Sequence, residues 1–336
     1  MFRAMGEYFN KLTTGIGQGW NKFWYTPQDA CMLGFIRVLT GVVLLYVHVA
    51  YCFDLERLYG PQALVQVSTV ETLQQQGVAS EREMAKESIR ELFSFSYLRL
   101  ARNNTDLWVL HAIGFVVLLL FTAGYNSRIS AVLALIVTLS YRHRAPMLTF
   151  EFEPILTFVQ LYLCLGPCGA AFSLDRWLAE RKSSTPLLPP VSYDAGIVIR
   201  LMQVHVSLVF LMMALGKLAG PNPPAVWWTG EAVWWLLASV DTRPFDFTGL
   251  AMGTESSKLV DIWTHAIVWF ELGFGFLVWK REARPLMLFL MVILWIPLVS
   301  LATGLFLFTA MLAFASLSFI SGSTLRSSLG TCGQCV

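Results

Sequence analysis

AGIVIRLMQVHVSLVFLMMALGKLAG, residues 195–220, is an apolar run long enough to cross a lipid bilayer as one helix. Lys217 lies near the end of this run. A charged group costs about 2.5–3.5 kcal/mol on insertion scales when it lies near the bilayer centre, and such groups usually have a function or a partner. Desolvation favours the neutral amine, which is a usable base. The alternative is a lysine that reaches from the helix end to the membrane interface, and the nearby helix breaker Gly220-Pro221 keeps this interpretation open.

The composition is typical of a multi-spanning membrane protein. Hydrophobic residues make up 56% of the chain and charged residues 14%, whereas soluble domains carry about 25% charged residues. The 12 Trp and 24 Phe residues are of the kind that anchors helices at the lipid headgroups. A net charge of +2 gives no support for a nucleic-acid partner. Because the composition is that of a membrane protein, we expect the lipid bilayer to be the partner.

Further apolar runs predict an all-α, polytopic membrane helix bundle with about eight transmembrane helices. The polar segment 54–106 is expected to be an extramembrane loop, and its stretches 80–83 and 86–93 predict an amphipathic loop helix. We find no domain boundary, so 1–336 is expected to form a single transmembrane domain. No internal repeat is visible, which disfavours a transporter built from inverted repeats. The expected spans are 31–53, 107–122, 129–141, 154–172, 195–219, 261–279 and two helices within 285–320, broken near Thr303-Gly304.

The Lys and Arg residues of the short connecting segments predict the orientation of the bundle. With the N-terminus in the cytoplasm, most of them fall on the cytoplasmic side, and an even number of helices returns the C-terminus there. We expect no removable signal peptide and a multi-pass protein of the bacterial inner (cytoplasmic) membrane. Lys217 then lies toward the outer face, capped by the loop that carries Trp227 and Glu231.

Lys217 shares one face of its helix with two other residues. Gln203 and Phe210 precede it at heptad intervals, so the three form a stripe with a drift of about 20° per heptad. We expect this stripe to line a cavity, with Trp227 and Glu231 as further neighbours of Lys217.

Three more charged residues fall inside predicted helices, namely Arg37, Arg200 and Glu271. The predicted topology puts them in or near the inner half of the membrane, away from Lys217, so Glu271 is the expected counter-charge for Arg200 or Arg37. We expect these three to form a structural ion network that fixes helix register, not a catalytic site.

The cysteines and histidines predict no metal site. Four cysteines lie in or beside the expected spans, and Cys332 and Cys335 form a CGQC motif in the C-terminal tail. A C-x-x-C motif near a βαβ pattern would indicate redox chemistry, but no such pattern surrounds this one, and the role of the pair stays open. The five histidines show no H-x-x-x-H or H-E-x-x-H spacing.

Five stretches of the sequence, taken in this order, resemble those of a known family. They are FWYTPQDACMLGFIRVLTG (23–41), LGPCGAAFSLDRW (165–177), QVHVSLVFLMMALGKLAG (203–220), WWTGEAV (227–233) and Glu271-Leu272 before a basic turn. Over nearly the whole chain they resemble the HTTM family, the bacterial membrane proteins similar to the vitamin K-dependent gamma-carboxylase. In the carboxylase, the lysine of the motif similar to Gly216-Lys217-Leu218 deprotonates vitamin K hydroquinone. The resemblance implies the same role for Lys217, and a reduced quinone of the menaquinone or vitamin K type as cofactor.

One departure from the carboxylase concerns its catalytic histidine, which lies in the helix before the SLD-like motif. In this chain the count back from 173–175 reaches Phe152, flanked by Glu151 and Glu153. The resemblance therefore implies quinone-dependent, oxygenase-like or carboxylase-like chemistry without assigning the substrate.

Two functions from different classes remain open. The first is an enzyme that uses a reduced quinone around Lys217. The alternative is a non-catalytic subunit of a larger membrane protein complex, in which the charged stripe docks a membrane protein partner or a lipid.

Overall fold

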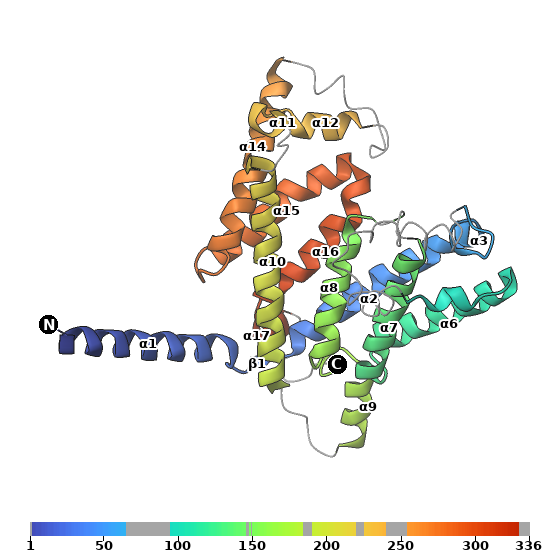
Figure 1. Ribbon diagram of the computed structural model, residues 1–336, viewed down its shortest axis with the longest axis horizontal. Helices are drawn as coiled ribbons and strands as arrows, with labels where there is room; N and C mark the ends of the chain where they lie inside the picture. The colour runs from blue at the N-terminus through green and yellow to red at the C-terminus, as the bar shows by residue number, and fades with distance from the viewer. Residues whose placement is uncertain are drawn as a thin grey trace, which may run out of the picture. The chain divides into compact units, whose positions relative to one another are not determined.

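The computed structural model describes residues 2–64, 95–145, 148, 150–183, 190–219, 225–239 and 254–328, and these are almost entirely helical (Figure 1). The expected all-α helix bundle is confirmed. The chain divides into two compact units: unit 1 comprises Met1–Gln28 with Ala195–Ser321, and unit 2 comprises Asp29–Asp194 with Gly322–Val336. The amphipathic helix expected within 80–93 lies outside the described residues, as do Cys332 and Cys335. The single-domain assignment stays a prediction.

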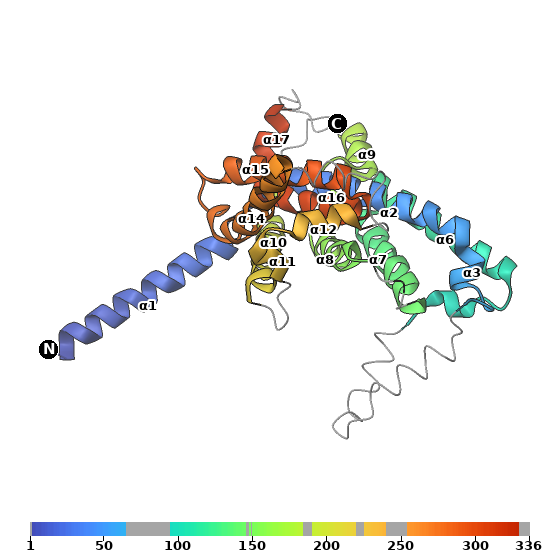
Figure 2. The ribbon, with the colours of Figure 1, turned by 90° about the horizontal axis from the view of Figure 1, so that it is seen from above.

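The helices of unit 2 form a bundle in which α2, α6, α7 and α8 pack in succession (Figures 1 and 2). Gly41 allows the close approach of α2 and α6, because a Cβ atom there would lie 2.3 Å from Oγ1 of Thr122. Two short strands, β1 (Gln28–Asp29) and β2 (Val191–Ser192), pair with each other. The helices of unit 2 are α2 (Cys31–Tyr51), η1 (Cys52–Asp54), α3 (Leu55–Tyr59), η3 (Tyr97–Leu100), α6 (Asn104–Ala123), α7 (Ser127–Arg144), α8 (Phe152–Leu165), α9 (Leu174–Lys182) and α17 (Gly322–Ser328).

The ends of α6 illustrate how local sequence sets these bounds. The side chain of Asn103 accepts a hydrogen bond from the backbone N–H of Asp106 at 2.8 Å, which caps the first turn. The helix ends at Gly124, whose φ of 71° lies in the left-handed region that glycine adopts without strain. Asn126 then continues the turn into α7.

In unit 1, aromatic side chains of α10, α14 and α15 pack together. Phe210 of α10 packs against Phe274 and Phe270 of α14, with ring centroids 4.0 and 5.8 Å apart, and Trp295 of α15 covers the same ring. The break expected near Thr303-Gly304 is confirmed, because a 3₁₀ turn there separates α15 from α16. The helices of unit 1 are α1 (Phe2–Trp24), α10 (Tyr193–Ala219), α11 (Ala225–Thr229), α12 (Ala232–Ala238), α14 (Thr254–Leu277), α15 (Arg284–Leu301), η5 (Thr303–Leu305), α16 (Phe306–Ser316) and η6 (Leu317–Phe319).

Among the described residues, four helical segments are long and apolar enough to cross a membrane, and a fifth is added if the bent pair Phe306–Phe319 and Gly322–Ser328 counts as one span. The helices Phe152–Leu165 and Arg284–Ser300 are apolar but shorter. The chain therefore has the helices of a multi-pass membrane protein, while the count of eight spans and the orientation stay predictions. The four segments are Cys31–Tyr59, Asn104–Ala123, Tyr193–Ala219 and Lys258–Leu277.

Candidate functional site

Lys217 and Glu271 form an ion pair inside unit 1. Nζ of Lys217 donates a hydrogen bond to Oε1 of Glu271. The Glu271 side chain is fully buried, whereas the Lys217 side chain is 17% exposed. A buried carboxylate is costly without a partner, so the ammonium is what makes Glu271 tolerable at this position. The pair thus joins a shielded carboxylate to an amine that remains within reach of a ligand.

The packing of α10 against α14 brings the two charges together. The helices run in opposite directions, since Leu211 faces Gly275 and the later residue Lys217 meets the earlier residue Glu271. A Cβ atom on Gly275 would lie only 3.3 Å from Cβ of Leu211, so the glycine allows close contact. Lys217 also occupies the last turn of α10, where the helix dipole favours a cation.

Trp227 covers the ammonium of Lys217. Nζ lies 4.6 Å from the centroid of the Trp227 ring, which is the geometry of a cation–π contact. The tryptophan belongs to α11, and α14 anchors the segment that carries it. Nε2 of His265 lies 3.2 Å from the carbonyl oxygen of Trp228, and Oγ1 of Thr264 accepts a hydrogen bond from the N–H of Val233 at 3.2 Å. The α11–α12 segment is therefore held against α14 at Trp228 and Val233, directly after Trp227 and at the start of α12.

The other residues expected around Lys217 have different surroundings. The amide of Gln203 donates to the carbonyl of Ser318 at 2.7 Å and accepts from Arg200 at 3.0 Å. Phe210 is fully buried among aromatic rings, which occupy the space where the sequence predicted a cavity. Glu231 is exposed. The structure thus brings Trp227 to Lys217, while Gln203 and Phe210 serve helix packing.

The structure corrects the expected ion network. Within unit 1, Glu271 pairs with Lys217 and not with Arg200, whose guanidinium lies against Gln203 and over the ring of Phe23, 4.8 Å from its centroid. Arg200 precedes Lys217 by roughly 25 Å along α10, at about 1.5 Å per residue. Glu271 contacts α10 at its C-terminal end, beside Lys217. The charges of the loops predict which side of the membrane each loop occupies, but not which residues of α10 and α14 lie opposite each other.

Arg37 has a separate role in unit 2. Its guanidinium is fully buried and donates to the carbonyl oxygens of Cys168, at 3.0 Å, and of Phe172. A Cβ atom on Gly124 would lie 2.2 Å from this guanidinium, so the turn between α6 and α7 needs glycine for space as well as for its backbone conformation. Arg37 therefore fastens α2 to the turn that precedes α9.

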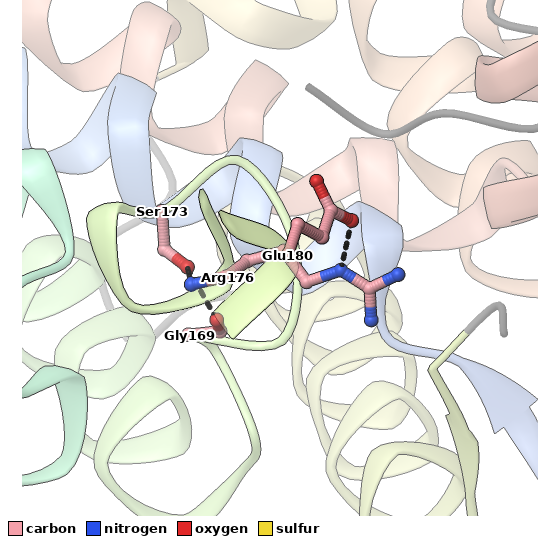
Figure 3. A network of polar contacts seen from close by, with 4 residues as sticks. All are labelled: Gly169, Ser173, Arg176 and Glu180. Atoms are coloured by element: carbon pink, nitrogen blue, oxygen red, sulfur yellow. Dashed lines mark hydrogen bonds and ion pairs between the residues drawn. The ribbon is translucent and has the colours of Figure 1, made fainter. Parts of the chain in front are cut away.

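The SLD-like motif is also structural. Ser173 caps α9 by accepting a hydrogen bond from the N–H of Arg176 at 3.0 Å, and its hydroxyl donates to the carbonyl of Gly169 (Figure 3). One turn later, Nε of Arg176 pairs with Glu180 at 2.6 Å (Figure 3). These contacts fix the start and the first turns of a surface helix.

Asp175 ties the same motif to the start of α7. Its carboxylate accepts backbone hydrogen bonds from Asn126 and Ser127, both at 2.8 Å, and a third from the Ser127 hydroxyl. Burial by itself raises the pKa of this carboxyl, but the hydrogen bonds from Ser127 and Asn126 outweigh burial and hold the pKa of Asp175 below its usual value.

Unit 2 contains a cluster of polar side chains that was not predicted from the sequence. The imidazole rings of His48 and His111 stack with centroids 3.9 Å apart, and His111 contacts both Cys52 and Tyr141. Cys52, the first residue of η1, follows His48 of α2 by four residues, a spacing that offered a signal, but His111 comes from another helix. Beside the cluster is a cavity of about 30 Å³, whose lining includes Tyr141 and Glu153.

Within the described ranges, no group of three or more His, Cys, Asp or Glu residues is arranged to hold a metal ion. The chain was also compared with known proteins. No family model matches it, and neither does any curated protein or solved structure.

Proposed function

We propose that this protein is an integral membrane enzyme that removes a proton from a reduced quinone of the menaquinone or vitamin K type, with Lys217 as the base. The observation that carries the proposal is the pairing of Lys217 with the fully buried Glu271. The resemblance of the Gly216-Lys217-Leu218 segment to the HTTM family supplies the substrate class.

The pair accounts for how a lysine that starts as an ammonium accepts a proton. As the hydroquinone hydroxyl transfers its proton to Nζ of Lys217, Lys217 passes one of its own protons to Oε1 of Glu271. The products are a quinol anion, a Lys217 ammonium and a neutral Glu271 carboxylic acid. The pair changes from net neutral to net positive as the substrate becomes negative, so the new anion lies beside a cation that is no longer neutralised.

The surroundings of the pair suit an apolar substrate. Trp227 offers an aromatic face next to the amine, and the buried residues Val233 and Ile267 belong to the hydrophobic cluster against which Trp227 packs. Low local polarity strengthens the attraction between the quinol anion and the ammonium. A reduced quinone dissolved in the lipid would reach this region without crossing water.

We propose proton removal by Lys217, followed by oxidation of the quinol anion by molecular oxygen, which gives the quinone and hydroperoxide. By the resemblance, Phe152 stands where the carboxylase has its catalytic histidine, and a phenyl ring neither donates nor accepts a proton. We therefore do not extend the proposal to the carboxylation of glutamate.

Lys217→Arg tests the proposal, because arginine keeps the positive charge but has a pKa above about 12 and does not release a proton. Oxidation of reduced menaquinone by the purified protein in lipid vesicles, followed through oxygen uptake, should fall by about 100-fold or more if general base catalysis is lost. Lys217→Ala should be equally inactive, and small primary amines should restore part of its rate. Full activity of Lys217→Arg, or a wild-type protein without turnover, would favour the non-catalytic subunit.

A further inference from the structure

Cys52, His111 and Tyr141 form a connected row in unit 2, away from any role in the proposed quinone chemistry. Sγ of Cys52 lies 3.0 Å from Nε2 of His111, and Nδ1 of the same imidazole lies 2.7 Å from the hydroxyl of Tyr141. The three residues come from η1, α6 and α7, so the tertiary structure assembles them.

This geometry is that of an activated nucleophile. A thiol becomes reactive when a base within hydrogen-bond reach takes its proton and a third group fixes the base in the correct tautomer. When Nδ1 of His111 donates to the Tyr141 oxygen, Nε2 carries the lone pair that faces Cys52. The stack of His48 on His111, 7° from parallel, holds the ring in that plane. Cys52 thus has a base, and the base has an orienting partner.

The place of Cys52 in the fold indicates the kind of substrate. It follows the last turn of α2, near the end of the candidate span Cys31–Tyr59, and its side chain is half-buried. An exposed apolar stripe runs along α2 up to this point, with residues at helical spacing. Cys52 lies at the edge of the stripe, between it and the buried His48. The stripe consists of Val42, Tyr46, Val49 and Phe53.

We propose that Cys52 is a second reactive site, which accepts a long-chain acyl group and holds it as a thioester. The acyl chain would lie along the apolar stripe of α2, with its carbonyl carbon at Sγ. Cysteines beside membrane helices are a recurrent location for S-acylation, and the His111 contact distinguishes Cys52 from a simple juxtamembrane thiol.

The reaction is a balanced acyl transfer. The Cys52 proton passes to Nε2 of His111, the thiolate attacks the acyl carbonyl, and an S–C bond forms while the bond to the leaving group breaks. The leaving thiolate or alkoxide takes the proton from His111. An acyl thioester in the aqueous phase and an acyl ester of a phospholipid present the same carbonyl chemistry, so the experiment includes both donors.

The test uses the full-length protein in detergent micelles or vesicles, with Cys332 and Cys335 replaced by serine. It is incubated either with palmitoyl-coenzyme A or with dipalmitoyl phosphatidylglycerol vesicles, and its intact mass is measured before and after neutral hydroxylamine. One palmitoyl group should be added, hydroxylamine should remove it, and Cys52→Ser should prevent its addition. The donor that works identifies the source, and no transfer from either donor overturns the proposal.

The variants His111→Gln and Tyr141→Phe show whether Cys52 reacts because His111 activates its thiol or only because the thiol is accessible. Loss of the base should slow acylation by about 100-fold or more, and Tyr141→Phe should slow it less. Cys164 is a matched control, because it is also half-buried and lies in the apolar helix α8. Acylation of Cys164 as fast as Cys52, or an unchanged rate in His111→Gln, contradicts the proposal.

A measurement on the unmutated cluster covers the case in which His111→Gln does not fold. Iodoacetamide should alkylate Cys52 at least about ten times faster than Cys164, as followed by peptide mass spectrometry, because the thiolate is the reactive form. Equal rates for the two thiols would show that His111 does not activate Cys52.

Discussion

Nζ of Lys217 contacts Oε1 of Glu271 across α10 and α14, and the carboxylate has no exposure to solvent while the lysine side chain keeps 17% of its own. Among the described residues, Oε2 of Glu271 has no hydrogen-bond partner. One carboxylate oxygen thus carries the ion pair, and the other is buried without a second partner in the described part of the chain.

Glu271→Gln should destabilise the protein by leaving the Lys217 ammonium without its counter-charge. Removal of one member of a buried pair costs roughly 3–5 kcal/mol, and the partial exposure of Lys217 should bring the loss below that range. Thermal unfolding in detergent measures it. The double variant Lys217→Met/Glu271→Gln should recover much of the loss, and an additive double variant would show that the two side chains are not coupled.

Carboxylated glutamate should not form. Purified protein supplied with reduced menaquinone, labelled bicarbonate and glutamyl peptides is expected to incorporate no label. By the resemblance, Phe152 stands where the carboxylase has the histidine of its carbon dioxide step, and a phenyl ring has no donor or acceptor for that role. Label in the peptide would prove this expectation wrong. Phe152→His is the companion variant, and it keeps a planar ring at a buried position of α8.

Acid should weaken unit 2 through Asp175. The pKa of this carboxyl is lower in the folded protein than in the unfolded chain, so its contribution to stability is present above about pH 4 and is lost as the pH falls through the folded-state value. Urea unfolding of the wild type between pH 6 and pH 3 should show the loss. Asp175→Asn should be less stable at pH 6 and should lack this part of the pH dependence. Parallel curves for the two proteins would exclude the effect.

The orientation predicted from Lys and Arg residues is open to direct test. Reporter fusions or cysteine labelling should place Trp228 outside the cytoplasm, and Arg181 and Arg281 inside it. A fusion at Arg181 that reports an outside location contradicts the orientation and the eight-helix count together.

Most of the fold could be predicted from the apolar runs of the sequence, because a helix that faces lipid must be apolar along its length. They predicted α2, α6, α10 and α14, and Thr303-Gly304 marked the break before α16. The partner of Lys217 was not accessible from the sequence in the same way. Charged loops indicate which side of a membrane a loop occupies, but the meeting of Lys217 with Glu271 depends on the register of α10 on α14, which aromatic rings and Gly275 set.

The cluster around His111 shows the same limit for a site built from three helices. His48 and Cys52 are separated by one helical turn, but nothing in the sequence places His111 or Tyr141 beside them. Spacing reveals sites that lie on one helix, whereas this cluster requires the packing of α2, α6 and α7.

The contacts of Arg37, Gly124 and Asp175 determine what a sequence motif built on these three residues can indicate. These residues lock α2, α6, α7 and α9 together, and none of them touches Lys217 or Cys52 in the contacts described above. A motif search built on them would recover proteins that share a folding scaffold, whatever reaction those proteins perform. A chain that keeps the scaffold but has another residue in place of Lys217 would be a natural comparison, in which the fold is retained and the base is absent.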